Sequence, residues 1–66
     1  MRVMINGQWQ EKQAPLTLAT LLQDLSLQPR RVALELNGRI VSRANYAATE
    51  LSDNDKLEIV SLVGGG

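Results

Sequence analysis

Residues 17–25 read Thr-Leu-Ala-Thr-Leu-Leu-Gln-Asp-Leu, and this stretch decides the fold of the chain. Its leucines have the spacing i, i+3, i+4 and i+7, which forms one stripe of an amphipathic helix: Leu18, Leu21, Leu22 and Leu25. Thr17 precedes the first leucine and can cap the helix, because its hydroxyl oxygen can accept a bond from an unpaired backbone N–H. Pro29 ends any continuation. The stretch therefore predicts a helix over residues 18–25 with its leucines in a core.

An Asn-Gly pair lies on each side of this helix, and each pair predicts a β-hairpin. Asn6-Gly7 separates the alternating residues 2–5 from residues 8–12, and Asn37-Gly38 closes the alternating stretch 32–37. Asn-Gly is the strongest short hairpin signal, because both central positions of a type I′ turn have positive φ. A two-residue turn also fixes which residues of the two strands face each other.

In the first hairpin this register places Met4 opposite Trp9 on the outer face of the predicted sheet. Arg2 lies opposite Glu11, so we expect an exposed cross-strand ion pair of small energetic value. In the second hairpin the alternation turns three side chains inward: Val32, Leu34 and Leu36.

The last third of the chain predicts a loop, a turn and a final strand. Residues 42–51 have no clean period and are expected to form a loop with one helical turn near Tyr46. In the turn at residues 53–55, Asn54 is the residue best able to take a left-handed conformation. Residues 56–63 form the last strand, in which Val60 and Leu62 place apolar side chains on the outer face.

The order strand, strand, helix, strand, short strand, strand predicts a β-grasp arrangement. This is an α+β fold in which one main helix packs on one face of a mixed sheet. The opposite face stays open and carries four apolar side chains: Met4, Trp9, Val60 and Leu62. Exposed apolar surface often marks an interaction site. The alternative is that a loop or the tail of the chain covers the end of the last strand.

Composition excludes several function classes. With 66 residues there is room for one small domain, and seven Lys+Arg balance seven Asp+Glu, which argues against nucleic-acid binding. The chain contains no Cys and no His, so thiolate chemistry and the commonest general base are absent. No apolar run is long enough for a signal peptide or membrane span, and we expect a soluble cytoplasmic protein.

Two charged groups could still bind something, although solvated surface explains both more simply. The acidic residues of the last third lie close together and could hold a cation, but they lack the EF-hand pattern: Asp53, Asp55 and Glu58. Four arginines form a loose basic cluster that could act as an electrostatic docking surface: Arg30, Arg31, Arg39 and Arg43.

The sequence ends in Val63-Gly64-Gly65-Gly66. Glycine loses more conformational freedom on ordering than any other residue, so residues 64–66 are expected to be a flexible tail on a domain formed by residues 1–63. Three extended residues span about 10 Å, enough to place the Gly66 carboxylate inside a partner's active site. The functional interpretation is a carrier whose reactive group is its own C-terminus. The alternative is an unstructured end or an expression scar.

These features together resemble the ThiS family, the ubiquitin-like β-grasp sulfur carriers of thiamine biosynthesis. The similarity covers almost the whole chain through five motifs: Asn6-Gly7, Thr17 ahead of Leu21-Leu22, residues 32–38 (VALELNG), Ile40-Val41 and residues 57–66 (LEIVSLVGGG). The ending, joined to a chain of this length, is the specific part. Asn54 stands where the family commonly has glycine, and asparagine can adopt the same backbone conformation.

The resemblance implies a chemistry that belongs to partners. A ThiF-like adenylating enzyme uses ATP to activate the Gly66 carboxylate, and sulfur from a donor system then replaces oxygen to give a thiocarboxylate. A thiazole synthase takes that sulfur. The carrier itself is expected to be no enzyme, with no catalytic residue, bound cofactor or metal. Gly64 and Gly65 would thread the partner's active site, and a docking surface would include Met4, Val60, Leu62 and Val63.

Two other functions remain open at this point. The small subunit of molybdopterin synthase resembles this fold and also ends in Gly-Gly, but it is usually longer and more aromatic near its end, and this chain has no Phe. A ubiquitin-like binding or protein-conjugating module is the other. Sulfur transfer requires a free Gly66 carboxylate, conjugation requires an isopeptide bond to lysine, and a binding module requires neither.

Overall fold

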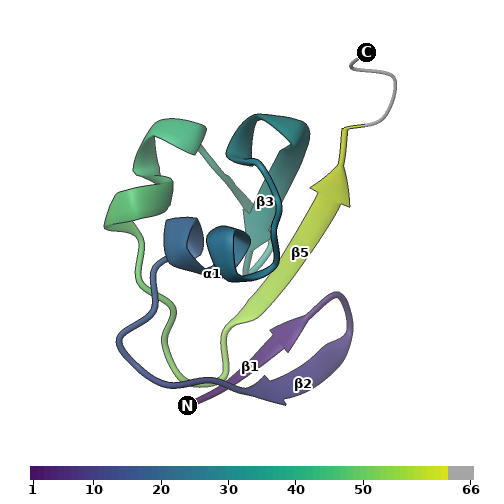
Figure 1. The fold of residues 1–66 in the computed structure, drawn as a ribbon. Helices are drawn as coiled ribbons and strands as arrows, with labels where there is room; N and C mark the ends of the chain where they lie inside the picture. Colours follow the sequence, from purple (N-terminus) through teal and green to yellow (C-terminus); the bar gives the residue numbers. More distant parts are fainter. Residues whose placement is uncertain (63–66) are drawn as a thin grey trace.

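A computed structural model describes residues 1–62 of the chain, and within them a five-stranded sheet packs against one α-helix and two short 3-10 helices (Figure 1). The elements in chain order are β1 (Arg2–Ile5), β2 (Gln8–Glu11), α1 (Leu18–Asp24), η1 (Pro29–Arg31), β3 (Val32–Leu36), β4 (Arg39–Val41), η2 (Arg43–Ala48) and β5 (Lys56–Ser61).

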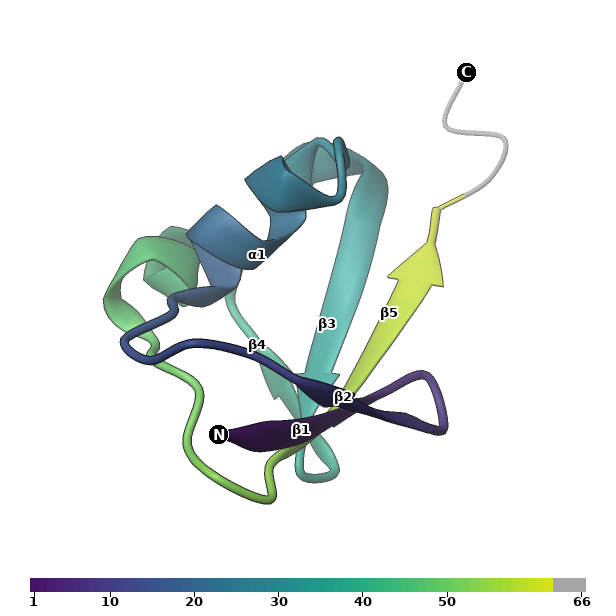
Figure 2. The same cartoon turned by 60° about the horizontal axis from the view of Figure 1, so that its bottom comes forward.

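The sheet has the strand order β2-β1-β5-β3-β4, so the last strand lies in its centre. β5 runs parallel to β1 and antiparallel to β3. Within the two hairpins, β1 is antiparallel to β2 and β3 is antiparallel to β4. The predicted α+β arrangement, a mixed sheet with one main helix on one face, is confirmed. Figure 2 shows α1 and η2 together on one side of the sheet, with no helix on the other side within residues 1–62.

Both predicted hairpin turns are confirmed. Asn6 and Gly7 have φ values of 50° and 83°, and Asn37 and Gly38 have values of 52° and 84°, as a type I′ turn requires. The register of the first hairpin is also as predicted, with Met4 opposite Trp9. Asn54 takes the expected left-handed conformation, with φ of 71°.

The helix begins as predicted but ends one residue earlier. The Thr17 hydroxyl oxygen accepts a bond from the backbone N–H of Thr20 at 3.1 Å, which confirms the N-cap. Leu25 is the C-cap and is 41% exposed, so its predicted place in the core is wrong. The reason is the next residue: Ser26 has φ of 59°, which turns the chain away from the helix axis.

A Schellman motif closes this end of the helix. The N–H of Leu27 bonds to the carbonyl of Leu22 at 2.8 Å, and the N–H of Ser26 bonds to the carbonyl of Gln23 at 3.0 Å. Glycine is the usual residue at the left-handed position of this motif. Because serine occupies it here, the end of the helix at residue 24 could not be recognised from the residue types.

The last strand is shorter than predicted, since β5 ends at Ser61 and not at residue 63. Its partner β3 begins at Val32, which lies opposite Ser61, so the sheet offers no further strand there. The N–H of Leu62 instead bonds to the carbonyl of Arg31 in η1 at 2.9 Å. Val63 lies outside the described residues.

The core lies between the sheet and the two helices that cover it. The segment expected to be a loop with one helical turn is the 3-10 helix η2, and it buries Tyr46 against the core. No buried polar or charged residue occurs among the described residues. The fully packed core consists of Val3, Ile5, Leu16, Leu18, Leu21, Leu22, Val32, Leu34, Tyr46, Leu51 and Leu57.

We expect Leu22→Ala to lower the free energy of unfolding by about 2–5 kcal/mol, because it removes a fully buried leucine and leaves a cavity under the sheet. Urea denaturation measures the change. Leu25→Ala is the matched control from the same helical stripe, and it should cost less than about 1 kcal/mol because Leu25 is exposed. Equal costs for the two variants would contradict the observed end of α1.

We expect Ser26→Gly to raise the free energy of unfolding by about 0.5–1 kcal/mol, because glycine adopts the left-handed conformation of this position without strain. Ser42→Gly is the control, since Ser42 has φ of −65° and gains nothing from glycine. Urea denaturation of the wild type and both variants under the same conditions gives the three free energies of unfolding to be compared. A loss of stability in Ser26→Gly would argue against the Schellman motif.

Candidate functional site: the last strand and the open face

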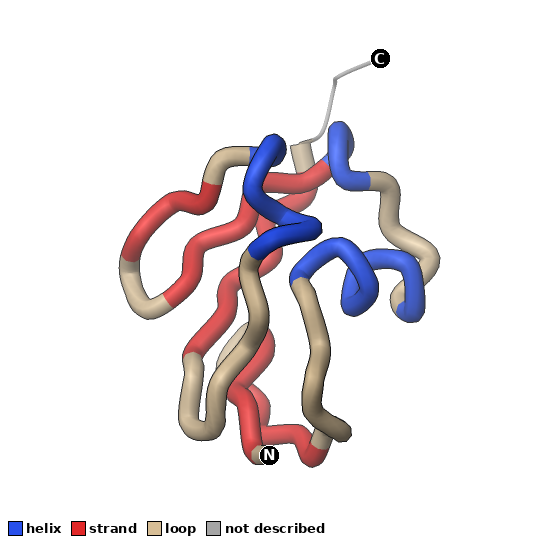
Figure 3. The backbone as a smooth tube through the Cα atoms, turned by 90° about the vertical axis from the view of Figure 1, so that its left-hand side faces the viewer, coloured by secondary structure: helices blue, strands red, loops and turns tan. Residues whose placement is uncertain are grey.

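The predicted site is built on β5, the last strand of the chain that the structure describes. β5 ends at the opposite end of the molecule from the N-terminus, as two perpendicular views show (Figures 1 and 3). Its neighbours β1 and β3 hydrogen-bond to both of its edges. The predicted site residues Val63, Gly64, Gly65 and Gly66 lie outside the described residues.

The two turn asparagines hold β5 by their side chains as well as by their backbones. The Oδ1 atom of Asn6 accepts the N–H of Ile59 at 2.7 Å, and the backbone N–H of Asn6 donates to the carbonyl of Leu57 at 2.9 Å. Each bond joins the first hairpin to the last strand. Asn6 thereby extends the β1–β5 pairing beyond the end of β1 itself.

Asn37 does the same from the other side of β5. Its Oδ1 atom accepts the N–H of Lys56 at 2.9 Å, and its backbone N–H donates to the carbonyl of Lys56 at 2.7 Å. Its Nδ2 group donates to Oδ1 of Asp55 at 3.0 Å. The sequence interpretation gave both asparagines a turn role alone. One feature of the sequence could have revealed this second role: both turns have Asn at their first position, and the Asn side chain carries a hydrogen-bond acceptor.

The acidic residues of the turn before β5 accept hydrogen bonds from the backbone. Oδ1 of Asp53 accepts the backbone N–H of Arg2 at 2.7 Å, and Oδ2 of Asp55 accepts the N–H of Ser52 at 2.7 Å. Within residues 1–62, no group of three or more potential ligand residues could hold a metal ion. The acidic residues therefore fix the turn that leads into the last strand.

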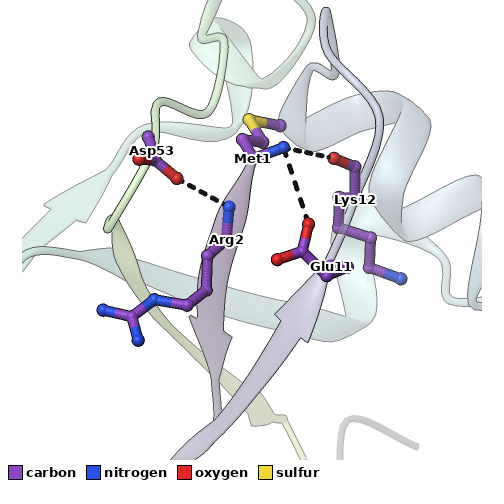
Figure 4. A network of polar contacts seen from close by, with 5 residues as sticks. All are labelled: Met1, Arg2, Glu11, Lys12 and Asp53. Carbon is purple, nitrogen blue, oxygen red and sulfur yellow. Dashed lines mark hydrogen bonds and ion pairs between the residues drawn. The ribbon is translucent and has the colours of Figure 1, made fainter.

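Figure 4 shows how the start of β1 is held in this region. The amino group of Met1 donates to the carbonyl of Lys12 at 2.8 Å and lies 3.9 Å from the carboxylate of Glu11. The predicted ion pair between Arg2 and Glu11 is wrong, although the two residues face each other as expected. The Arg2 guanidinium turns the other way and lies 3.8 Å from the centroid of the Trp9 ring.

This arginine changes the chemical character of one corner of the outer face. Its carbon Cζ stacks on the Trp9 ring, and its Nη2 group donates to Oδ1 of Asn54 at 3.0 Å. A cation over an aromatic face contributes about 0.5–1 kcal/mol at an exposed site. We predicted that Trp9 would be part of the open apolar surface. One face of its ring is instead covered by a charged group.

Val60 and Leu62 are exposed, as the alternation of the last strand predicts, with 53% and 50% of their surfaces accessible. Val60 lies on β5 opposite Ala33, and Leu62 follows directly after the strand. The structure therefore brings these two predicted docking residues together next to the start of the tail.

Met4 does not join them. It is half-buried and pairs with Lys56, four residues before Val60 on β5. Four strand residues correspond to about 13 Å along the strand. Alternation placed Met4 on the correct face, but only the pairing of β1 with β5 determines its position along that face.

The four arginines of the predicted basic cluster belong to three different elements. Arg30 and Arg31 belong to η1, whose last carbonyl bonds to Leu62, whereas Arg39 begins β4 and Arg43 begins η2. One pair of these arginines therefore lies beside the end of β5. No helix in the described part of the chain is long and apolar enough to cross a membrane.

The model of the ThiS family matches residues 3–66. A thiazole synthase of Paramagnetospirillum magneticum is 42% identical over 66 residues, which is all of this chain but 20% of that protein. The chain thus spans about one fifth of the length of this relative and of a second thiazole synthase, from Magnetococcus marinus. The sulfur carrier protein ThiS of Bacillus subtilis is 40% identical over 50 residues, or 76% of each chain.

The crystal structure of the thiamine biosynthesis protein (ThiS) from Geobacter metallireducens superimposes with a TM-score of 0.84 at 32% identity, covering 100% of both chains. This match confirms the expected ubiquitin-like β-grasp fold. Together with the family match over residues 3–66, it shows that the chain belongs to the ThiS family.

Proposed function

We propose that this protein is a sulfur carrier for the formation of the thiazole ring of thiamine, with the Gly66 carboxylate as its reactive group. The observation that supports this most directly is membership of the ThiS family across residues 3–66. The Bacillus subtilis relative named as a sulfur carrier protein adds to it. In this proposal the carrier is a co-substrate, and the catalytic groups belong to its partners.

The proposed reaction has two steps, both catalysed by partners. A ThiF-like adenylating enzyme first joins an oxygen of the Gly66 carboxylate to the α-phosphorus of ATP, and pyrophosphate leaves. Sulfur at the oxidation level of sulfide, from a donor system, then forms a bond to the carbonyl carbon, and AMP leaves. The product is a thiocarboxylate, which is anionic and nucleophilic at sulfur. A thiazole synthase receives this sulfur.

A thiazole synthase is proposed as the acceptor because two relatives that bear this name contain a sequence like the whole of this chain within a longer protein. The fixed part of the carrier suits a tail that must be delivered to a partner. The first half of β5 is bonded on both edges by β1, β3, Asn6 and Asn37, and its end is held by β3 and by the bond from the N–H of Leu62 to Arg31. The residues that follow are thus attached to an ordered strand.

We expect one alanine added after Gly66 to abolish activation, because it moves the terminal carboxylate by about 3.5 Å from the position where it attacks the nucleotide. Gly65→Val should also block activation, because a β-branched side chain cannot pass a channel shaped for glycine. The measurement is the intact mass after incubation with the ThiF-like enzyme, ATP and a sulfur donor. The wild type should gain the increment for one oxygen replaced by one sulfur.

Neither change should alter the thermal midpoint of unfolding, which is the control for folding. If the extended protein formed the thiocarboxylate as well as the wild type, the carrier role of Gly66 would be refuted.

We further propose that Val60 and Leu62 dock the adenylating enzyme. Leu62→Asp should weaken the association at least about tenfold, because it places a charge on apolar surface that the partner covers. Leu25→Asp is the matched control: Leu25 is exposed to a similar degree but lies at the end of α1, on the covered side of the sheet. Titration calorimetry gives both affinities. Unchanged affinity for Leu62→Asp would remove Leu62 from the interface.

A further inference from the structure

The outer face of the sheet carries a strip of four exposed residues across β4, β3 and β5: Ile40, Glu35, Glu58 and Val60. Glu35 lies opposite Ile40 on one side and opposite Glu58 on the other, so these three side chains share one face. Val60 is two residues beyond Glu58 on the same strand and therefore points the same way. The strip faces away from α1.

The centre of this strip is electrostatically unfavourable in the free protein. Residues directly opposite each other have Cβ atoms about 4.5–5.5 Å apart, and like charges in this position are destabilising. Within residues 1–62, neither Glu35 nor Glu58 takes part in an ion pair or a side-chain hydrogen bond. Lys56 lies on the same face, yet it forms no ion pair with either carboxylate.

Apolar side chains flank the two carboxylates. Ile40 is 78% exposed, more than any other large hydrophobic residue that the structure describes, and Val60 follows on the other side. A partner that covers this strip must therefore bring a cation to the centre and apolar surface to the edges. Arginine meets both needs, because its guanidinium can bond to two carboxylates while its methylene groups lie against aliphatic side chains.

We propose that this strip docks an arginine-bearing surface of the adenylating enzyme. The proposal rests on the proposed function and extends it from Val60 across the sheet to Glu35, Glu58 and Ile40. The strip is continuous with Val60 and Leu62, which lead to the tail, so one partner can cover both. A second copy of the chain is a poor occupant, because two such carboxylate pairs would face each other.

The test is Glu35→Lys, which replaces two like charges by an opposite pair. The free protein should become more stable, with a thermal midpoint about 2–6 °C higher. The affinity for the ThiF-like enzyme should fall at least about tenfold, because the partner's cation now meets a lysine. Stability and binding thus change in opposite directions, which a structural defect cannot produce.

Three variants act as controls. Glu50→Lys makes the same charge change at an exposed position beside the start of α1, and its affinity should stay within about twofold of the wild type. Glu35→Gln should weaken binding without adding a positive charge. Glu35→Lys combined with Glu58→Lys restores a like-charged pair, so the thermal midpoint should fall below that of the single variant while binding stays weak.

The proposal is overturned if Glu35→Lys binds the adenylating enzyme as the wild type does, or if Glu50→Lys loses as much affinity. It is also overturned if affinity falls for thiazole synthase alone. At saturating enzyme, Glu35→Lys should still form the thiocarboxylate. Failure of the wild type to form it would instead refute the proposed function, and this docking proposal with it.

Discussion

The pairing of β5 with β1 and β3 is the interaction on which the rest of the structure depends. In the order β2-β1-β5-β3-β4 the two hairpins share no hydrogen-bonded edge, so only the last strand joins them into one sheet. Asn6 and Asn37, one from each hairpin, add side-chain bonds to its backbone. Both hairpins therefore fix the first half of β5, and β3 alone carries the pairing to Ser61 at its end.

The sequence predicts best what neighbouring residues decide. The leucine spacing of α1 and the positive φ values of two Asn-Gly turns are local properties, and both were interpreted correctly. The end of α1 was not, because Ser26 holds a conformation that usually requires glycine. The partner of Arg2 was also missed, since cross-strand register allows both Glu11 and Trp9, and only side-chain geometry selects the aromatic ring.

The candidate site shows the same limit. Alternation along a strand tells which face a side chain occupies, and it correctly exposed Val60 and Leu62. It cannot tell how far along the sheet two strands are displaced, because that depends on pairing between the first and last segments of the chain. Met4 was consequently placed near Val60, whereas it pairs with Lys56. The side-chain bonds of Asn6 and Asn37 escaped notice for the same reason, as both reach a strand distant in sequence.

The two faces of the sheet differ in a way that stability alone does not explain. The covered face contributes to a core without a buried polar or charged residue among the described residues, as expected for a domain of this size. The open face instead combines directly opposed residues Glu35 and Glu58 with Ile40, which is 78% exposed. The opposed carboxylates make the free protein less stable, and the exposed side chain of Ile40 contributes little buried apolar surface to it. A complementary cation and apolar surface laid over this face would remove both costs, and this is the physical basis of the docking proposal for the strip.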